Sequence, residues 1–521
     1  MAESELARDV ESVLAVDPDA FDERVREDAA VIKEEIEAGT FDNPQAIVGL
    51  EYEFYGVADD GSLARIPRRV LEFVGFEKEL GLHNAEMTAS PQPLNEYGLA
   101  AQESEVRARL EAAAEPMDAE GLHLVSDAMW TIPPEGETAR EYLTDSVNDD
   151  GVEIATNMSA STRYHAMANT DRPASMGIDA PHVSLDADTV MPEALITSIQ
   201  PHYQVPQAVD LPTYFRYAVR LAGPLLALGV NSPFYPPDLY DADATPEAIL
   251  ADGHDEGRID VFEDVLNVPG KSEKVRFPRD LDSVQDAVDA VVADATVVPM
   301  PPTSVASGGR FDDEFAHFRM KHGTFWRWVR PVFGGASKES ANARIEFRPL
   351  PGQPTVRDTM AFQALLAGAL EAMVARDHPL YDLPWETARE NFYAAVRDGS
   401  DAEITYRGVD GETTDADEMY ADLFEQAEAG LRSRGLDEEA AAKYLWPLRQ
   451  RARHGVTPAD WKRERVRENL DDGASFENAV YDMQYDYLEY QRDTLITGSF
   501  ADWTGRGEEL EAETHRSNRR G

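Results

Sequence analysis

The segment Ile47-Val48-Gly49-Leu50-Glu51-Tyr52-Glu53-Phe54-Tyr55 alternates between apolar and polar residues. As a β-strand it would carry apolar side chains on one face (Val48, Leu50, Tyr52 and Phe54) and Gly49, Glu51 and Glu53 on the other. So apolar a strand belongs inside a sheet, and its second face would then hold two carboxylates in the interior. Buried carboxylates without a positive partner are too costly to persist. We therefore expect a cation over them, and a divalent metal held by oxygen ligands is the natural candidate.

The acidic composition limits how much this pattern says by itself. Asp and Glu make up 99 of the 521 residues, so roughly 19 acidic-x-acidic triplets are expected by chance. What distinguishes this one is its apolar, β-prone frame and Gly49, which lets a ligand or another backbone come close. The alternative, a surface pair of glutamates on an edge strand, stays open at this point.

Net charge is extreme, at 48 − 99 = −51. A disordered acidic protein or a nucleic-acid mimic could have this charge, but 42% hydrophobic and 9% aromatic residues favour a folded protein. The acidity is spread along the chain, and the basic residues are 8 Lys and 40 Arg. This composition predicts a cytoplasmic protein of an extreme halophile, where molar salt screens charge within a few ångströms. Binding to nucleic acid or to anionic membranes is disfavoured.

The absence of cysteine excludes disulfides, thiolate catalysis and zinc-thiolate sites. The first residues contain neither a basic nor an apolar stretch, so we expect no signal peptide. The most apolar helical segment, 360–375, includes Gln363 and Glu371, which fits a buried helix better than a membrane span. We expect small-molecule substrates and leave the oligomeric state open.

We expect three regions along the chain. Residues 1–45 are predicted to form an N-terminal helical segment, and residues 386–521 a helical C-terminal region. Between them, residues 46–385 are predicted to form a catalytic domain. This domain includes an insertion-like stretch of loops and one or two helices at 236–300. The acidic stretch 133–155, punctuated by Pro and Gly, predicts a loop. The arginine-rich helices at 431–469 are expected to present mainly solvated faces.

Three further strands carry polar residues at alternate positions. The segment 80–91 places Glu86 in mid-strand, 344–348 carries Glu346 and Arg348, and 196–205 carries Gln200 and His202 on one face. Pro201 predicts that the last of these is an edge or bulged strand. Carboxylates and arginines on one sheet face suit a polyphosphate with bound Mg²⁺. No phosphate-binding Gly-rich loop ending in Gly-Lys-Ser/Thr is present.

These segments resemble, in order, the motifs of the glutamate–cysteine ligase family, among the glutamine synthetase-like carboxylate–amine ligases. The matching pieces are its first-strand Gly-x-Glu-x-Glu motif at 49–53, its second acidic strand at 85–88, Arg-Tyr-x-x-Met at 163–167, the strand at 198–202, Asn-Ser-Pro-Phe at 231–234, and Trp326 to Pro331 followed by Glu-x-Arg at 346–348 and Gln-Pro-Thr at 353–355. Each motif is weak alone, but six in order are specific. The resemblance covers about 46–380.

The resemblance implies an α/β (α+β) fold with a curved, mainly antiparallel sheet, flanking helices and a helical C-terminal region. It implies ATP as co-substrate and Mg²⁺, or Mn²⁺, as the metal. Glu51, Glu53, Glu86 and Glu346 would be the metal ligands. Arg348 would hold the transferred phosphate, Arg330 and Arg163 would bind substrate carboxylates, and Gln200 and His202 would contact substrate, nucleotide or metal.

The implied reaction phosphorylates the γ-carboxylate of glutamate and joins it to the amine of cysteine or a related amine. The 236–300 stretch, Pro201 and Tyr203 depart from the family pattern near the expected pocket, so the substrates stay open. The alternatives are a ligase of other substrates, an enzyme that phosphorylates a guanidino group, a non-catalytic binder of nucleotide or amino acid, and a metal-dependent hydrolase.

Overall fold

A curled antiparallel sheet lies at the centre of the molecule. The computed structural model describes residues 2–170, 176–267, 272–300 and 308–505. The strand order is β10-β11-β9-β1-β3-β2, and β4 pairs with the end of β1. The strands are β1 (Ile47–Ala58), β2 (Glu77–Lys78), β3 (Asn84–Pro93), β4 (Leu122–Val125), β9 (Ile199–Val205), β10 (Val329–Gly334) and β11 (Asn342–Phe347). Every recorded pairing among these strands is antiparallel.

Strand β1 has the alternation that its sequence predicts. Its apolar residues Val48, Leu50, Tyr52 and Phe54 are at most 1% exposed, while Gly49, Glu51 and Glu53 on the other face are only partly covered. The sheet packs against three helices: α12 (Val356–Ala375) contacts β1 and β9, α4 (Glu96–Asp118) contacts β3 and β4, and α7 (Leu211–Gly229) contacts β10 and β11. Helix α12 begins where the sequence predicts, because Thr355 caps it by accepting a hydrogen bond from the Asp358 N–H.

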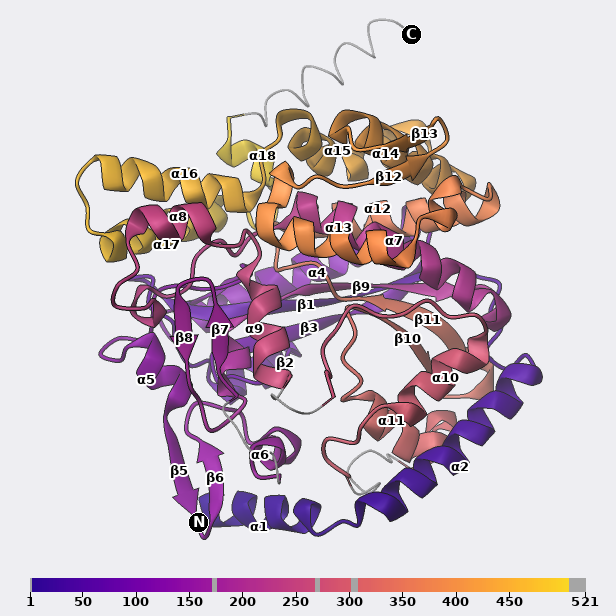
Figure 1. Cartoon of the computed structure of the whole chain (residues 1–521), viewed down its shortest axis with the longest axis horizontal. Coiled ribbons are helices and arrows are strands. Elements are labelled where there is room, and N and C mark those ends of the chain that lie inside the picture. Colours follow the sequence, from indigo (N-terminus) through magenta and orange to yellow (C-terminus); the bar gives the residue numbers. More distant parts are fainter. Residues whose placement is uncertain (1, 171–175, 268–271, 301–307, 506–521) are drawn as a thin grey trace, which may run out of the picture.

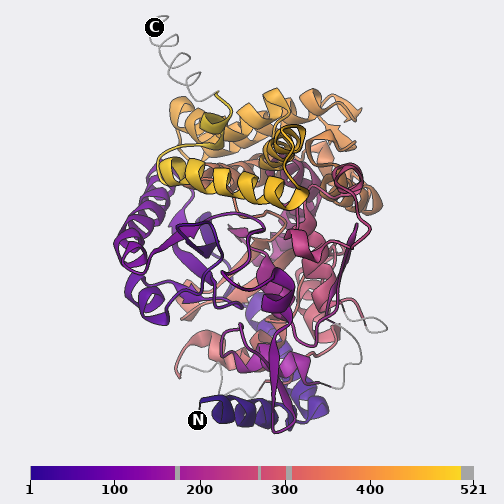
Figure 2. The same cartoon turned by 90° about the vertical axis from the view of Figure 1, so that its left-hand side faces the viewer.

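The C-terminal helices form a further layer above α7 and α12 (Figures 1 and 2). They are α13 (Trp385–Asp398), α14 (Ala416–Ser433), α15 (Glu438–His454), α16 (Pro458–Asp471), α17 (Phe476–Thr494) and α18 (Phe500–Trp503), with a small hairpin of β12 (Tyr406–Gly408) and β13 (Gly411–Thr413). The predicted fold, a curved antiparallel sheet flanked by helices with a helical C-terminal region, is therefore confirmed. The three-region division of the chain remains a prediction, and its last residues, 506–521, lie outside the described part.

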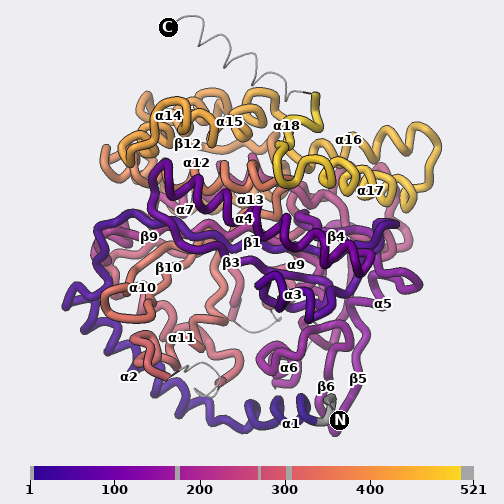
Figure 3. Tube along the Cα trace, turned by 180° about the vertical axis from the view of Figure 1, so that it is seen from behind, coloured from indigo at the N-terminus to yellow at the C-terminus, as the bar shows by residue number. Residues whose placement is uncertain are grey.

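The polar face of the sheet is bordered by a different set of elements. Helices α1 (Ala2–Leu14) and α2 (Pro18–Glu37) run along the far side of the molecule, opposite the C-terminal helices (Figures 1 and 3). Helix α1 packs on α6 (Thr162–Ala168), whereas α2 packs on α10 (Val284–Ala293) and α11 (Ala316–His322). Asp28 of α2 caps α11 by accepting hydrogen bonds from the N–H groups of His317 and Phe318. The N-terminal helices thus hold α6 and α11 in place.

The prediction that Pro201 marks an edge or a bulge is wrong, because β9 lies inside the sheet between β1 and β11. The register explains why proline is tolerated there. Glu53 N–H donates to Ser198 O, so Pro201 and Leu50 form a non-hydrogen-bonded pair, and the missing N–H would point toward β11. Pairing with β11 begins only at His202, the residue after the proline. No ladder hydrogen bond is therefore lost.

Two loop predictions are also corrected. The stretch 133–155 contains helix α5 (Ala139–Thr144) and a hairpin of β5 (Ser146–Asp149) and β6 (Val152–Ala155), because Thr138 and Glu141 form a capping box that starts the helix. The stretch 236–300 has three α-helices, α8 (Pro246–Asp252), α9 (Gly257–Leu266) and α10, in its described residues. The remaining elements are α3 (Arg68–Val74), β7 (Ile178–Ala180) and β8 (Val183–Leu185). None of the helices in the described residues is long and apolar enough to cross a membrane.

Candidate active site

The polar residues singled out in the sequence lie side by side on one face of the sheet. In the strand register Glu86 is opposite Glu53, Glu51 opposite Gln200, and His202 opposite Glu346. Arg330 is in turn opposite Glu346 on the next strand. Directly opposed residues in an antiparallel pair have neighbouring side chains on the same face. Five strands (β3, β1, β9, β11 and β10) thus bring their polar and charged side chains into one row.

Gly49 makes room for this row. A Cβ atom at Gly49 would lie 3.3 Å from the Cβ of His202, its partner across the strands. The close approach expected at this glycine is therefore made by the His202 side chain. His202 in turn places Nε2 3.4 Å from Glu51 Oε1, and its Nδ1 accepts a hydrogen bond from Arg344 Nε.

Glu346 is the carboxylate with the strongest positive surroundings. Its Oε1 lies 2.9 Å from Arg330 Nη2 and 2.6 Å from Arg348 Nη1. Although burial opposes ionisation, these two arginines hold the pKa of Glu346 well below its usual range. Arg348 Nη1 also donates to Gln200 Oε1 at 2.6 Å, so Gln200 fixes the direction of the guanidinium. The Nε atoms of both arginines are buried without a hydrogen-bond partner.

Glu51, His202 and Glu346 form a potential metal site. One ligand atom from each lies within 4.8 Å of the others, and His202 Nε2 is buried without a hydrogen-bond partner. Burial opposes the ionisation of Glu51, but His202 and Arg348 outweigh it and lower its pKa. Two ionised carboxylates beside an unpartnered ring nitrogen suit a divalent cation, so the residues present fit a bound Mg²⁺ or Mn²⁺.

A second carboxylate group gathers around Glu53 and Glu86. Glu53 accepts hydrogen bonds from Ser198 N, Ser198 Oγ and Gln200 Nε2, at 2.7 to 3.0 Å. Burial and the neighbouring Glu79 nevertheless raise the pKa of Glu53 to about 7. Burial, Glu79 and Glu51 raise the pKa of Glu86 to about 11. Neither carboxylate has an ion pair among those of the described residues, and at Glu53 the attraction of Arg348 does not outweigh burial and the neighbouring carboxylate. This repulsion marks a second place where a cation fits.

Sequence reasoning missed several residues at this group. Glu53 and Glu86 line a cavity of about 160 Å³ whose further polar walls are Glu79, Tyr164, Glu193 and Arg258. Glu79 follows β2, and Glu193 lies in a short 3₁₀ helix before β9 (η1, Met191–Leu195). Neither glutamate sits in an apolar alternating frame. Among 99 acidic residues, nothing in the sequence distinguishes them.

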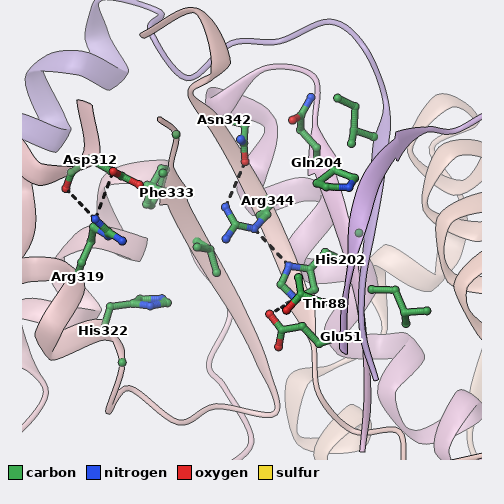
Figure 4. Close-up of a pocket in the computed structure, with 18 of the residues that line it drawn as sticks. Glu51, Thr88, His202, Gln204, Asp312, Arg319, His322, Phe333, Asn342 and Arg344 are labelled. Carbon is green, nitrogen blue, oxygen red and sulfur yellow. Dashed lines mark hydrogen bonds and ion pairs between the residues drawn. The ribbon is translucent and has the colours of Figure 1, made fainter. Parts of the chain in front are cut away.

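A larger cavity of about 440 Å³ adjoins the first and shares Glu51 and Gly323 with it. Figure 4 shows His202 and Arg344 on one wall and Arg319, His322 and Phe333 across from them. Arg319 is paired with Asp312, whereas the recorded polar partners of Arg344 are the uncharged Asn342 and His202 Nδ1. The Glu51–His202–Glu346 group thus lies where two cavities meet.

Arg163 lies beside the polar row of the sheet and not within it. It projects from α6 and places Nη2 3.7 Å from Met320 Sδ. A Cβ at Gly323 would lie 2.5 Å from Arg163 Nη1, so this glycine admits the guanidinium at the junction of the cavities. The described ion pairs give Arg163 no carboxylate partner, and burial lowers its pKa. A role in binding a substrate carboxylate remains a prediction.

The sequence matches a protein-family model over most of its length. The model described as glutamate-cysteine ligase family 2 matches residues 47–482. This chain belongs to that family. The predicted resemblance is confirmed over more of the chain than expected, since the match includes most of the C-terminal helices. Membership makes the chain a carboxylate–amine ligase, and no curated protein matches its sequence.

Solved structures with a similar fold are remote in sequence. They include a glutamate–cysteine ligase from Francisella tularensis in complex with AMP, with 14% identity, a TM-score of 0.48 and 91% of this chain and 95% of that one covered. A bifunctional glutathione synthetase from Pasteurella multocida has 14% identity and a TM-score of 0.47, covering 89% of this chain and 55% of that one. The ligase PafA in complex with the prokaryotic ubiquitin-like protein Pup has 11% identity and a TM-score of 0.36, covering 85% and 72%.

Proposed function

We propose that this member of the family uses ATP and Mg²⁺ to activate the γ-carboxylate of glutamate as an acyl phosphate and joins it to the amine of cysteine or a related amine. One observation carries the proposal. At the junction of two cavities, Glu51 and Glu346 face Arg330 and Arg348, so carboxylates for a metal and guanidinium groups for phosphate occupy the same few ångströms.

The two cavities divide the substrates between them. The larger one has apolar and aromatic walls, including Phe318 and Phe333, and ends at Arg344, which suits a nucleoside with its phosphates directed to the metal site. The smaller one has mainly acidic and aromatic walls beside Arg348, which suits glutamate and its amine partner. The γ-phosphoryl group and the acceptor carboxylate would meet between them.

Glu51, His202 and Glu346 would hold one divalent ion, and Glu53, Glu79 and Glu86 a second. When bound, Mg²⁺ neutralises charge on the phosphates and on the acceptor carboxylate. The protein's own residues supply orientation. Gln200 fixes Arg348, and Arg348 and Arg330 place guanidinium groups where charge develops on the transferred phosphoryl group.

Two steps follow. An oxygen of the γ-carboxylate attacks the γ-phosphorus of ATP, and ADP leaves. The amine, after its ammonium form has lost a proton, then attacks the carbonyl carbon. The C–N bond forms, the C–O bond to phosphate breaks, inorganic phosphate leaves, and the nitrogen loses a second proton to give the amide. Enclosure of the site limits hydrolysis of the acyl phosphate. No nucleophilic side chain is needed, in keeping with a chain that has no cysteine.

The test is ADP release by the purified full-length protein in molar KCl with Mg²⁺, with and without glutamate, across a panel of amines that includes cysteine. We expect release that requires glutamate and one amine. Turnover with another acid would place the chain among ligases of other substrates, and turnover with a guanidino compound would indicate a kinase. Hydrolysis of a substrate without nucleotide would indicate a metal-dependent hydrolase. Tight Mg-ATP binding with no turnover would indicate a non-catalytic binder.

A further inference from the structure

Glu193 has a position in the smaller cavity that the proposed metal ligands and arginines do not explain. It lines this cavity together with Glu53, Glu86 and Arg348, but it lies outside the row of cross-strand neighbours. Its Oε2 atom is buried and has no hydrogen-bond partner. The other carboxylates differ: Glu346 faces two arginines, Glu51 faces His202, and Glu53 accepts three hydrogen bonds.

The backbone that carries Glu193 is fixed. It belongs to η1, and the next two carbonyl groups are held by buried side chains. Ala194 O lies 2.8 Å from His83 Nε2, and Leu195 O accepts a hydrogen bond from Tyr55 OH at 2.8 Å. Burial lowers the pKa of His83 to about 4, so that ring is neutral. A carboxylate on such a support is positioned before a ligand arrives.

The surroundings of Glu193 favour an organic cation. Tyr164, Trp326 and Trp328 line the same cavity, and aromatic faces attract ammonium groups. None of the ion pairs recorded for the described residues involves Glu193, although Arg348 lies near enough to act on its pKa. An amine substrate arrives as an ammonium ion at neutral pH, and a buried carboxylate forms a strong, charge-assisted hydrogen bond with it.

We propose that Glu193 binds the ammonium group of the acceptor, orients its nitrogen toward the activated γ-carboxyl group and takes up one of its protons, so that the nitrogen attacks as the free amine. This inference rests on the proposed function, because it concerns the second substrate of that reaction. It assigns Glu193 to acceptor recognition and leaves metal binding to the glutamates of the sheet. Burial and Glu79 raise the pKa of Glu193 to about 8, in keeping with a carboxyl group that lacks its cationic partner in the free protein.

The test compares a charged and an uncharged acceptor. Glu193→Gln keeps the size of the side chain and removes its charge. The acceptors are cysteine, which is an ammonium ion at neutral pH, and hydroxylamine, which is uncharged there and yields γ-glutamyl hydroxamate. We expect the KM for cysteine to rise at least about tenfold, whereas the KM for hydroxylamine and the Mg²⁺ requirement change less than about twofold. Glu193→Asp, which keeps the charge, should recover part of the loss for cysteine.

Glu135→Gln is the matched control, because Glu135 is an exposed glutamate in a turn, and it should behave like the wild type. Equal losses with both acceptors, or a raised Mg²⁺ requirement in Glu193→Gln, would overturn the inference, as would an unchanged KM for cysteine. If the wild type releases no ADP with glutamate and any amine of the panel, the proposed function fails, and the inference fails with it. If it turns over only with another amine, that amine replaces cysteine as the charged acceptor. The wild-type result therefore separates the two failures.

Discussion

Two regions of this protein bury carboxylates and treat them in opposite ways. In the helical layer, Asp127 lies 2.6 Å from Lys462, and Asp358 lies 2.9 Å from Arg451, with all four side chains at most 2% exposed. On the polar face of the sheet, Glu53 and Glu86 have other carboxylates as close neighbours, and burial with Glu79 raises the pKa of both. In the first region each carboxylate has a cation at ion-pair distance, whereas none of the ion pairs of the described residues includes Glu53 or Glu86.

The difference suggests that the paired carboxylates serve stability and the unpaired carboxylates serve function. Asp127 also accepts hydrogen bonds from Gln484 Nε2 and Ala128 N, and Lys462 donates to Asn231 O. Each of the four charged side chains named above lies in an ion pair within the protein. Around Glu86 the repulsion costs folding free energy, and a ligand of opposite charge would offset it. Substitutions in the paired region should therefore lower the free energy of unfolding. Substitutions at the unpaired carboxylates should mainly lower activity.

The largest effect should come from Glu51→Gln. This change keeps the shape of the side chain but removes a carboxylate from the proposed metal site. We expect turnover to fall by at least about 10³-fold, while the free energy of unfolding stays within about 1 kcal/mol of the wild type. Steady-state ADP release and urea unfolding in molar KCl measure the two quantities. Near-normal turnover would contradict the site assignment.

The converse experiment is Lys462→Met in the paired region. It leaves Asp127 buried without its cation, and breaking a buried pair in this way costs about 3–5 kcal/mol. We expect that loss in urea unfolding, with KM values near those of the wild type for the fraction that stays folded. Lys443→Met is the control, because Lys443 is 53% exposed and its partner Glu103 keeps a second ion pair with Arg107, so the loss should be at most about 1 kcal/mol. Equal stability of the two variants would remove the contrast between the regions.

From the sequence, the polar residues that share one face of the sheet could be predicted better than the residues around them. The residues Glu51, Glu53, Glu86, Gln200, His202, Glu346 and Arg348 sit in alternating, apolar strand segments, where a polar residue at a fixed position signals one face of a sheet. Glu79 and Glu193 lie outside such segments, so periodicity could not reveal them. Glu79 and Glu193 come close to Glu86 only through the tertiary fold, in which the segments before β3 and β9 lie beside the polar face of the sheet.

In the arginine-rich helices, the prediction from sequence failed for charged residues that are buried. We expected mainly solvated faces at 431–469, yet Arg451, Lys462 and Arg463 are buried in ion pairs. In the sequence of a helix, a basic residue that pairs with a distant aspartate cannot be distinguished from one that is exposed to solvent. Asp127 is 335 residues from Lys462. Nothing in the sequence near either residue indicates that pairing. The position of Pro201 inside the sheet could not be predicted either, because it depends on the register of three strands.

A smaller effect, of opposite sign, is expected from Glu86→Gln. Burial and the neighbouring carboxylates raise the pKa of Glu86 from 4.5 to about 11, so at neutral pH folding must protonate this group. Glutamine removes that cost, and the metal-free variant should be about 2–3 kcal/mol more stable than the wild type. The variant should also gain less stability from added Mg²⁺. Destabilisation in urea unfolding would mean that Glu86 already has a partner in the protein.

The smallest effect concerns pH. The pKa of Glu53 is about 7 in the folded protein and 4.5 in the unfolded chain, so between these values the folded state binds more protons. Stability must then fall as pH rises, by about 1 kcal/mol per pH unit from this group. Urea unfolding of the metal-free protein between about pH 5 and about pH 7 should show this loss, and Glu53→Gln should reduce it. Excess Mg²⁺ should weaken the dependence, because a bound cation favours the ionised carboxylate in the folded state. Stability that rises with pH in the metal-free wild type, but not in Glu53→Gln, would mean that a protein cation already pairs with Glu53, and the two regions would no longer differ.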